Sequence, residues 1–191
     1  MEMGLHYRGH CGIIYGQKQV VNLLVKMKVY WGNWNMSRIE EDELFTIDVE
    51  WYGIDKKGNI AVFCSAGEAN VPEFVCADKE RYEFLVEWFD NLPSISEVQF
   101  CFNCSPRNTM PLVVAKEFSE KGLFYFDSDD HSKAIKNIGV FQRYYTISSK
   151  PVNPIRITDL PLHIQEILKD NYLPIDDFSK VNTIEVDHAY D

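Results

Sequence analysis

Residues 45–74 read FTIDVEWYGIDKKGNIAVFCSAGEANVPEF and contain two β-like runs separated by one turn. In the first run, apolar residues alternate with more polar ones from Phe45 to Trp51, a pattern typical of a half-buried strand. The turn DKKGN places Gly58 where a positive φ is favoured, and Ile60–Phe63 returns as a second strand. We therefore expect an antiparallel hairpin, followed by an irregular connection that ends at Pro72.

The rest of the chain alternates between helical and strand patterns. Apolar residues at helical spacing predict helices over Asp78–Leu92, Met110–Lys121 and Pro161–Lys169. Further strands are expected at Val98–Phe102, Leu123–Phe126, Ile138–Ser148 and Val181–Val186. This order predicts an α+β domain, with a mainly antiparallel sheet of about five to six strands and about three helices packed on one side of it.

The first 35 residues differ in composition from the remainder. They carry four bases and one acid, a net charge of +3. Because the formal net charge of the whole chain is −10, residues 36–191 carry −13. We consider 1–35 an N-terminal extension and 36–191 a single α+β domain. Two interpretations of the extension stay open: Met36 is the natural start, or residues 1–35 are a genuine docking arm.

The net charge indicates which classes of partner to expect, and the cysteines indicate the cellular compartment. A body this acidic repels phosphate groups and anionic lipid, so we expect no nucleic acid and no membrane as partner, and a basic protein instead. No apolar run approaches the roughly 20 residues needed to span a bilayer. Five cysteines, an odd number, without a secretory signal favour a reduced, cytoplasmic protein.

Cys101 and Cys104 form the one recognisable reactive spacing, CxxC. The pair lies several residues before the next predicted helix, so the helix dipole would activate a thiol only weakly. A zinc site would need two more ligands, and Cys64 and Cys76 are spaced singly. Buried or incidental thiols are the favoured interpretation. No GxGxxG, Walker, HExxH or GxSxG motif occurs, so we predict no cofactor, no metal and no catalytic residue.

Four residues are candidates for contact with a partner. Glu68 and Asn70 lie in the loop after the predicted hairpin, and Asp129 and Asp130 lie in the polar run Asp127–His131. That run begins like a calcium loop but lacks the glycine and the final acid that such a loop needs. We interpret it as a solvated, negative loop suited to a basic partner.

Three segments carry a resemblance to a known group of proteins. They are DVEWYGIDKKGNIAVFCSAGEANVP at Asp48–Pro72, FDNLP at Phe89–Pro93 and ITDLPLHIQEIL at Ile157–Leu168. Together they resemble small bacterial proteins, Bacteroidetes among their sources, that are similar to immunity proteins of polymorphic toxin systems. The resemblance implies a cytosolic, single-domain protein that neutralises a toxin domain by binding it. It covers roughly Phe45–Lys169, and its motifs are structural.

These observations predict a non-enzymatic cytoplasmic binding protein, of immunity or regulatory type, that covers a basic partner with an acidic face. The alternatives are an enzyme with a site assembled from scattered residues, and a thiol or metal protein that uses Cys101 and Cys104.

Overall fold

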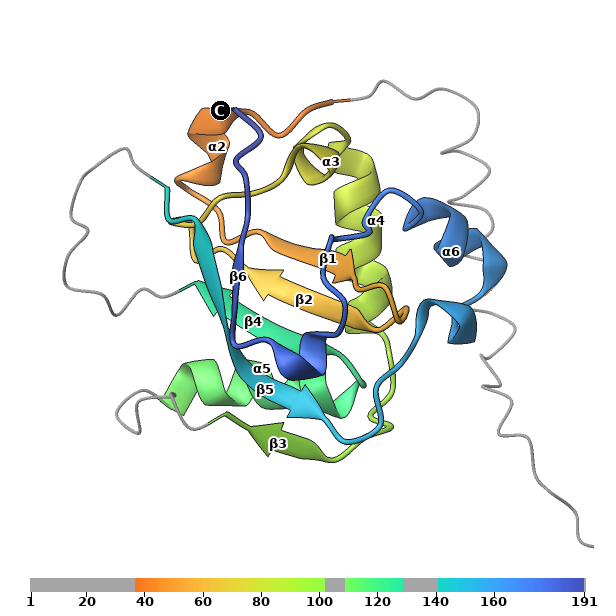
Figure 1. Cartoon of the computed structure of the whole chain (residues 1–191). Helices are drawn as coiled ribbons and strands as arrows, with labels where there is room; N and C mark the ends of the chain where they lie inside the picture. The colour runs from red at the N-terminus through yellow and green to blue at the C-terminus, as the bar shows by residue number, and fades with distance from the viewer. Residues whose placement is uncertain (1–36, 102–108, 129–140, 191) are drawn as a thin grey trace, which may run out of the picture. The chain divides into compact units, whose positions relative to one another are not determined.

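The computed structural model of the protein describes residues 37–101, 109–128 and 141–190 (Figure 1). All of them belong to one compact unit, Met36–Asp191. Its elements are α2 (Glu41–Leu44), β1 (Glu50–Ile54), β2 (Ile60–Cys64), α3 (Glu73–Cys76), α4 (Lys79–Asp90), β3 (Val98–Phe100), α5 (Thr109–Glu120), β4 (Phe124–Ser128), β5 (Tyr144–Pro151), the 3-10 turn η1 (Ile157–Asp159), α6 (Leu162–Ile167), the 3-10 turn η2 (Phe178–Lys180) and β6 (Thr183–Glu185).

The strands form one six-stranded sheet in the order β1-β2-β4-β5-β3, with β6 also paired to β5. Four of the five pairings are antiparallel, and β2 and β4 run parallel. The predicted α+β class with a mainly antiparallel sheet is therefore confirmed, with one parallel pair inside it. The expected strand over Ile138–Ser148 is shifted to β5, and its first three residues lie outside the described ones.

The predicted hairpin is present as β1 and β2. Their antiparallel register pairs Glu50 with Cys64 and Ile54 with Ile60. Gly58 has a φ of 81°, in the left-handed region that glycine adopts without strain. The main-chain N–H of this glycine donates to the Asp55 carbonyl at 2.9 Å, which closes the turn. Local turn chemistry therefore fixes the strand register.

The expectation of a half-buried strand from Phe45 to Trp51 is wrong. β1 begins only at Glu50, and the side chains on both of its faces are covered, with Trp51 and Tyr52 each 1% exposed. Phe45 instead directly follows α2 and is 46% exposed. The alternation failed because different parts of the chain cover the two faces of this sheet.

Helices α4 and α5 cover one face of the sheet (Figure 1). The Tyr52 ring of β1 stacks on Phe89 of α4 at 4.0 Å, and Tyr125 of β4 stacks on Phe118 of α5 at 5.9 Å. Asp78 starts α4 by accepting a hydrogen bond from the Arg81 N–H at 2.9 Å, as its sequence predicted.

The C-terminal segment covers the opposite face (Figure 1). There Trp51 stacks on Phe63 at 4.0 Å, and Phe63 stacks on Phe126 at 5.0 Å. Phe178 of η2 packs edge-on against Phe63, and this core of large rings is completed by Tyr145. Burial of each such side chain stabilises the fold by about 2–3 kcal/mol. Aromatic rings of the described residues thus form much of this core.

No helix among residues 37–101, 109–128 and 141–190 is long and apolar enough to cross a bilayer.

Candidate functional site

The four predicted contact residues fall into three situations. Glu68 is exposed, and Gln142 donates a hydrogen bond to its carboxylate at 3.4 Å. Asn70 is 3% exposed, and its side-chain amide donates to the Val186 carbonyl at 2.8 Å. Such a side chain offers a partner almost no surface, so we leave it out of the contact set. Asp129 and Asp130 lie outside the described residues.

An exposed aromatic pair lies beside Glu68. The Phe45 and Phe141 rings stack with centroids 4.2 Å apart, although Phe45 keeps nearly half of its surface in solvent. The main-chain N–H of Gln142, which follows Phe141, donates to the Glu68 carbonyl at 2.6 Å. The loop that carries Glu68 therefore lies directly against the aromatic pair.

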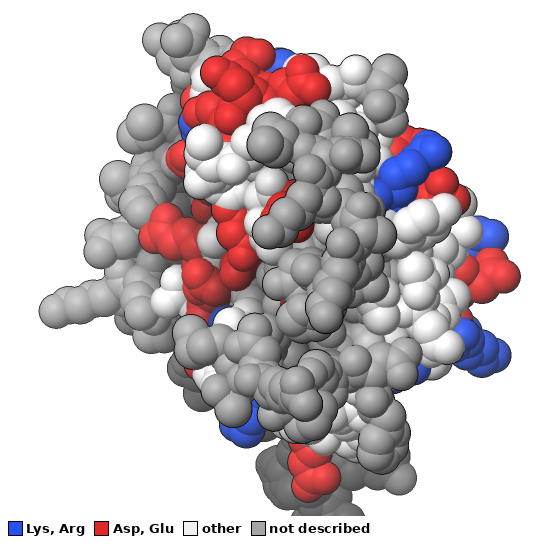
Figure 2. Space-filling model, turned by 90° about the vertical axis from the view of Figure 1, so that its left-hand side faces the viewer, with Lys and Arg blue, Asp and Glu red and all other residues white. Residues whose placement is uncertain are grey.

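Exposed acidic side chains lie on α2, directly before Phe45 in the chain, and on the Glu68 loop. Glu41 and Asp42 of α2 are exposed, and Glu41 precedes Phe45 by four residues, which places the two on one side of the helical turn. Figure 2 shows Asp and Glu gathered in the upper part of this face, where Figure 1 places α2. Neither Glu41 nor Asp42 pairs with a base among the described residues. We call Glu41, Asp42, Phe45, Glu68 and Phe141 the α2 patch.

Contacts beneath the α2 patch hold its two parts, α2 and the post-hairpin loop that carries Glu68, in place. The Asp48 carboxylate accepts the Ala66 N–H at 2.7 Å, at a residue whose φ of 51° is unusual for alanine. The adjacent Gly67 approaches the carbonyls that end α2, and a Cβ added there would lie 3.6 Å from the Phe45 oxygen. The post-hairpin loop and α2 are thereby fixed against each other.

The C-terminal residues clamp the chain just before α2. The Arg38 guanidinium donates two hydrogen bonds of 2.7 Å to the Glu73 carboxylate and lies 4.6 Å from the centre of the Tyr190 ring. The Tyr190 hydroxyl donates to the Ile39 carbonyl. A bidentate pair of this kind fixes geometry as well as charge, so the α2 patch stands on a rigid base.

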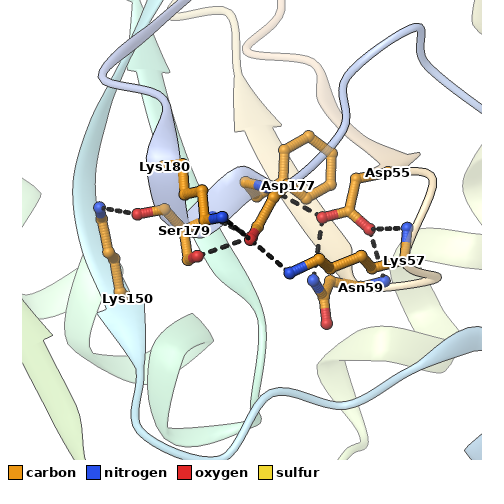
Figure 3. Close-up of polar contacts among 8 residues, drawn as sticks. Asp55, Lys57, Asn59, Lys150, Asp177, Ser179 and Lys180 are labelled. Carbon is orange, nitrogen blue, oxygen red and sulfur yellow. Dashed lines mark hydrogen bonds and ion pairs between the residues drawn. The ribbon is translucent and has the colours of Figure 1, made fainter.

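A polar network joins the hairpin turn to η2 on the other side of the unit (Figure 3). The buried Asp55 carboxylate accepts the N–H groups of Lys57, Asn59 and Phe178 and the Asn59 amide, each at 2.9 Å. The Lys57 ammonium donates to Asp177 at 2.7 Å. Every carboxylate here is saturated by its own chain, so this network acts as a structural tie.

The Asp177 carboxylate in this network is held ionised. The Lys57 ammonium and the Ser179 hydroxyl lower its pKa to about 2. Asp177 thus remains an anion under ordinary conditions, which suits an ion pair better than proton transfer.

The thiols of the described residues carry little reactivity. Cys64 and Cys76 are buried, and burial raises the pKa of Cys76 to about 12. Cys101 is half-buried, whereas Cys104 lies outside the described residues. A search of residues 37–101, 109–128 and 141–190 finds no group of three or more metal-ligating side chains.

A second set of titratable groups lies under α4 and α5. Burial raises the pKa of Glu50 to about 7, and the carboxylates of Asp90 and Asp48 act in the same direction. Burial also raises the pKa of the Cys64 thiol, and Glu50 adds to that effect. Perturbed groups that influence one another are a recognised sign of a functional site.

The sequence did not point to Phe45 or Glu50. Phe45 fitted the apolar positions of a strand, so the pattern placed it inside. Glu50 fitted the polar positions, so the pattern placed it in solvent. The one available signal was the acidic run Glu40–Glu43, which is separated from Phe45 by Leu44 and is typical of the start of a helix.

No family model, curated protein or solved structure that was compared with this chain matches it.

Proposed function

We propose that this protein binds a basic protein partner through the α2 patch and catalyses no reaction. The observation that carries the proposal is the Phe45 ring, 46% exposed and stacked on Phe141, with exposed acidic side chains on the adjoining α2 and on the Glu68 loop. Binding interfaces commonly combine one or two aromatic anchors at the centre with charged groups at the rim.

Charge and aromatic surface have separate roles in this mechanism. The formal net charge of −10 and the carboxylates of Glu41, Asp42 and Glu68 steer a basic partner and speed its association. The Phe45 ring loses its remaining water on contact and contributes affinity, which slows dissociation. The bound protein then covers the partner's basic site both sterically and electrostatically.

An immunity-type or regulatory role in the cytoplasm follows from this mode of action. Neutralising a toxin domain needs a rigid surface of complementary charge, and the clamp by Arg38, Glu73 and Tyr190 supplies rigidity next to the patch. The resemblance of the hairpin segment to immunity proteins supports the same role. Nucleic acid is disfavoured as partner because the patch repels phosphate groups.

The test captures partners of the full chain from its native host at low and at moderate salt. One variant reverses three charges of the patch, Glu41→Lys, Asp42→Lys and Glu68→Lys. Its matched control reverses three exposed charges away from the patch, at Glu97, Glu117 and Glu166. We expect the patch variant to associate at least tenfold more slowly with the captured basic protein, with a weaker dependence on salt.

Phe45→Ala separates anchoring from steering. Since the ring is half in solvent, the variant keeps its fold, and we expect faster dissociation with an unchanged association rate. Charge reversal at Asp129 and Asp130 tests the two remaining predicted contacts. The proposal fails if the patch variant binds like its control, or if no basic protein is captured at either salt concentration.

A further inference from the structure

The helix-covered face of the sheet carries a row of polar side chains. Glu50 of β1 pairs with Cys64 of β2, and Cys64 pairs with Asp127 of β4. Residues paired across neighbouring strands point to the same side of a sheet. Tyr52 lies on the same face, two residues along β1, so this row shares the side that α4 and α5 cover.

The row lies at a particular edge of the sheet. β2 and β4 are the parallel pair, and Cys64 and Asp127 lie at their carboxyl ends. The chain crosses over between these two strands through α4, β3 and α5. In open parallel α/β sheets, ligands bind outside the carboxyl ends of the strands, and β2 and β4 provide one such pair here.

The Tyr52 hydroxyl is a buried polar group that is open to a ligand. Tyr52 is 1% exposed, and its hydroxyl is buried without a hydrogen-bond partner in the part of the chain that the structure describes. Among the charged groups that act on this hydroxyl, Glu50 has the largest effect, followed by Asp90. Buried hydroxyls in proteins are nearly always hydrogen-bonded, so a donor or acceptor from a ligand would complete this one.

The charges around Glu50 select the sign of that ligand. Asp90 on α4 and Asp48 before β1 both raise the pKa of Glu50, and Lys121 after α5 is the base that opposes them. Lys121 already lies 3.5 Å from Asp90. Tyr82 on α4 also faces this cluster, and burial raises its pKa to about 12. The cluster therefore favours a positive group.

Aromatic rings next to the row suit the same kind of ligand. Lys121 shows this arrangement inside the protein, because its ammonium lies 4.9 Å from the centre of the Phe118 ring. Phe118 stacks on Tyr125, and burial raises the pKa of the neighbouring Cys64 thiol while Tyr125 lowers it. A ring face attracts a cation that a carboxylate also holds.

We propose that Glu50 and Tyr52 form a binding site for a small alkylammonium compound. The Glu50 carboxylate serves as the counter-ion, and the Tyr52 hydroxyl accepts a hydrogen bond from the ammonium. This site is separate from the α2 patch and takes a small amine, so it adds a second function to the proposed binding of a protein.

The test titrates the full chain with n-butylammonium at constant ionic strength, followed by calorimetry and by NMR of the protein. Butan-1-ol, which has the same alkyl chain without the charge, is the control ligand. We expect saturable binding of the amine and none of the alcohol. Because the site needs an ionised Glu50, the affinity is expected to fall at least tenfold between pH 8 and pH 5.5.

Two variants distinguish the site from general attraction to an acidic protein. Glu50→Gln is expected to weaken amine binding at least tenfold at pH 8, and Tyr52→Phe severalfold, whereas Glu97→Gln leaves it unchanged. Tyr52→Phe removes only the unpartnered hydroxyl, and circular dichroism with urea unfolding checks that both variants fold. Equal binding by folded Glu50→Gln, or equal binding of the alcohol, overturns the proposal.

The two proposals can fail independently. A protein that carries the three charge reversals of the α2 patch is expected to bind n-butylammonium with an affinity lowered by no more than about threefold, since none of those residues touches Glu50 or Tyr52 and their charges act on the site only through the screened potential. Loss of amine binding in that variant would show that the amine occupies the α2 patch, and would overturn the Glu50–Tyr52 site while leaving partner binding to its own test.

Discussion

Ionised Glu50 is expected to destabilise the folded protein, and Glu50→Gln tests this directly. Burial, with help from Asp90 and Asp48, raises the pKa of Glu50 from 4.5 to about 7. A group whose pKa is higher in the folded than in the unfolded chain stabilises the fold fully below pH 4.5. That stabilisation is lost as the pH rises through 7.

The size of the effect follows from the two pKa values. Their difference corresponds to about 3 kcal/mol at pH 8, and partial exposure of the side chain reduces this to about 1–2 kcal/mol. Glutamine has the shape of the protonated acid and cannot ionise. Glu50→Gln is therefore expected to gain stability relative to the parent protein, and the gain should grow by about 1 kcal/mol between pH 5.5 and pH 8.

Urea unfolding of the full chain at pH 5.5, 6.5, 7.5 and 8 measures this difference. Glu97→Gln, the loss of an exposed carboxyl elsewhere, serves as the control, and its difference from the parent protein is subtracted at each pH. The other titratable groups are the same in both proteins, so their contributions cancel in this difference. The direction in which the difference changes with pH therefore reports on Glu50 alone. A difference that stays constant or falls with rising pH would refute the reasoning about Glu50.

Three further substitutions probe the fold around the two sites. Asp55→Ala leaves four N–H donors, three of them buried, without their acceptor, and we expect a loss of about 3–4 kcal/mol in urea unfolding; a loss below about 1 kcal/mol would contradict the structural tie. Gly122→Ala gives a residue with a side chain a φ of 88° and places its Cβ 3.0 Å from the Ile155 nitrogen. We expect it to lower the free energy of unfolding in urea by about 1–3 kcal/mol, and no loss would mean that this turn relaxes freely. Tyr145→Phe removes a hydroxyl that donates to the buried Asn70 carbonyl at 2.7 Å and accepts from the Trp51 indole. We expect this change to lower the thermal midpoint by the equivalent of about 1–2 kcal/mol. The control Tyr144→Phe, at an exposed residue, should change stability by no more than about 0.5 kcal/mol.

The elements that the sequence predicted correctly depend on nearby residues. The hairpin follows from Gly58 and the turn around it, and α4 follows from its cap at Asp78 and its apolar stripe. Both signals lie within a few residues of the structure they produce. The class of fold could be predicted from such elements because their order leaves few ways to cover a sheet.

The parallel pairing of β2 with β4 could not be predicted in this way. Between these strands the chain forms two long helices and an edge strand, and nothing in residues 60–64 or 124–128 indicates which strands become neighbours. That pairing brings Asp127 beside Cys64 and so assembles the row under the helices. The row of Glu50, Cys64 and Asp127 could therefore not be assembled before the topology was known.

Burial explains the remaining errors at the candidate sites. Asn70 and Glu68 lie two residues apart in a polar loop, yet one is buried against Val186 and the other is in solvent. The C-terminal segment decides this, because it covers the face on which Asn70 lies. A loop position that a remote segment covers gives no local sign of it, whereas exposure of Glu68 is the ordinary behaviour of an acid in a loop.

Asp48 connects the two proposed sites. Its carboxylate holds the post-hairpin loop through Ala66, and its charge also acts on Glu50. If a cation binds at Glu50, the local potential becomes less negative near the loop that carries Glu68. By linkage, a small amine and a basic protein would then weaken each other's binding, each by the same factor. A protein that is held by charge at one face and that takes up a cation at the neighbouring edge would thus release its partner more readily when amines are abundant.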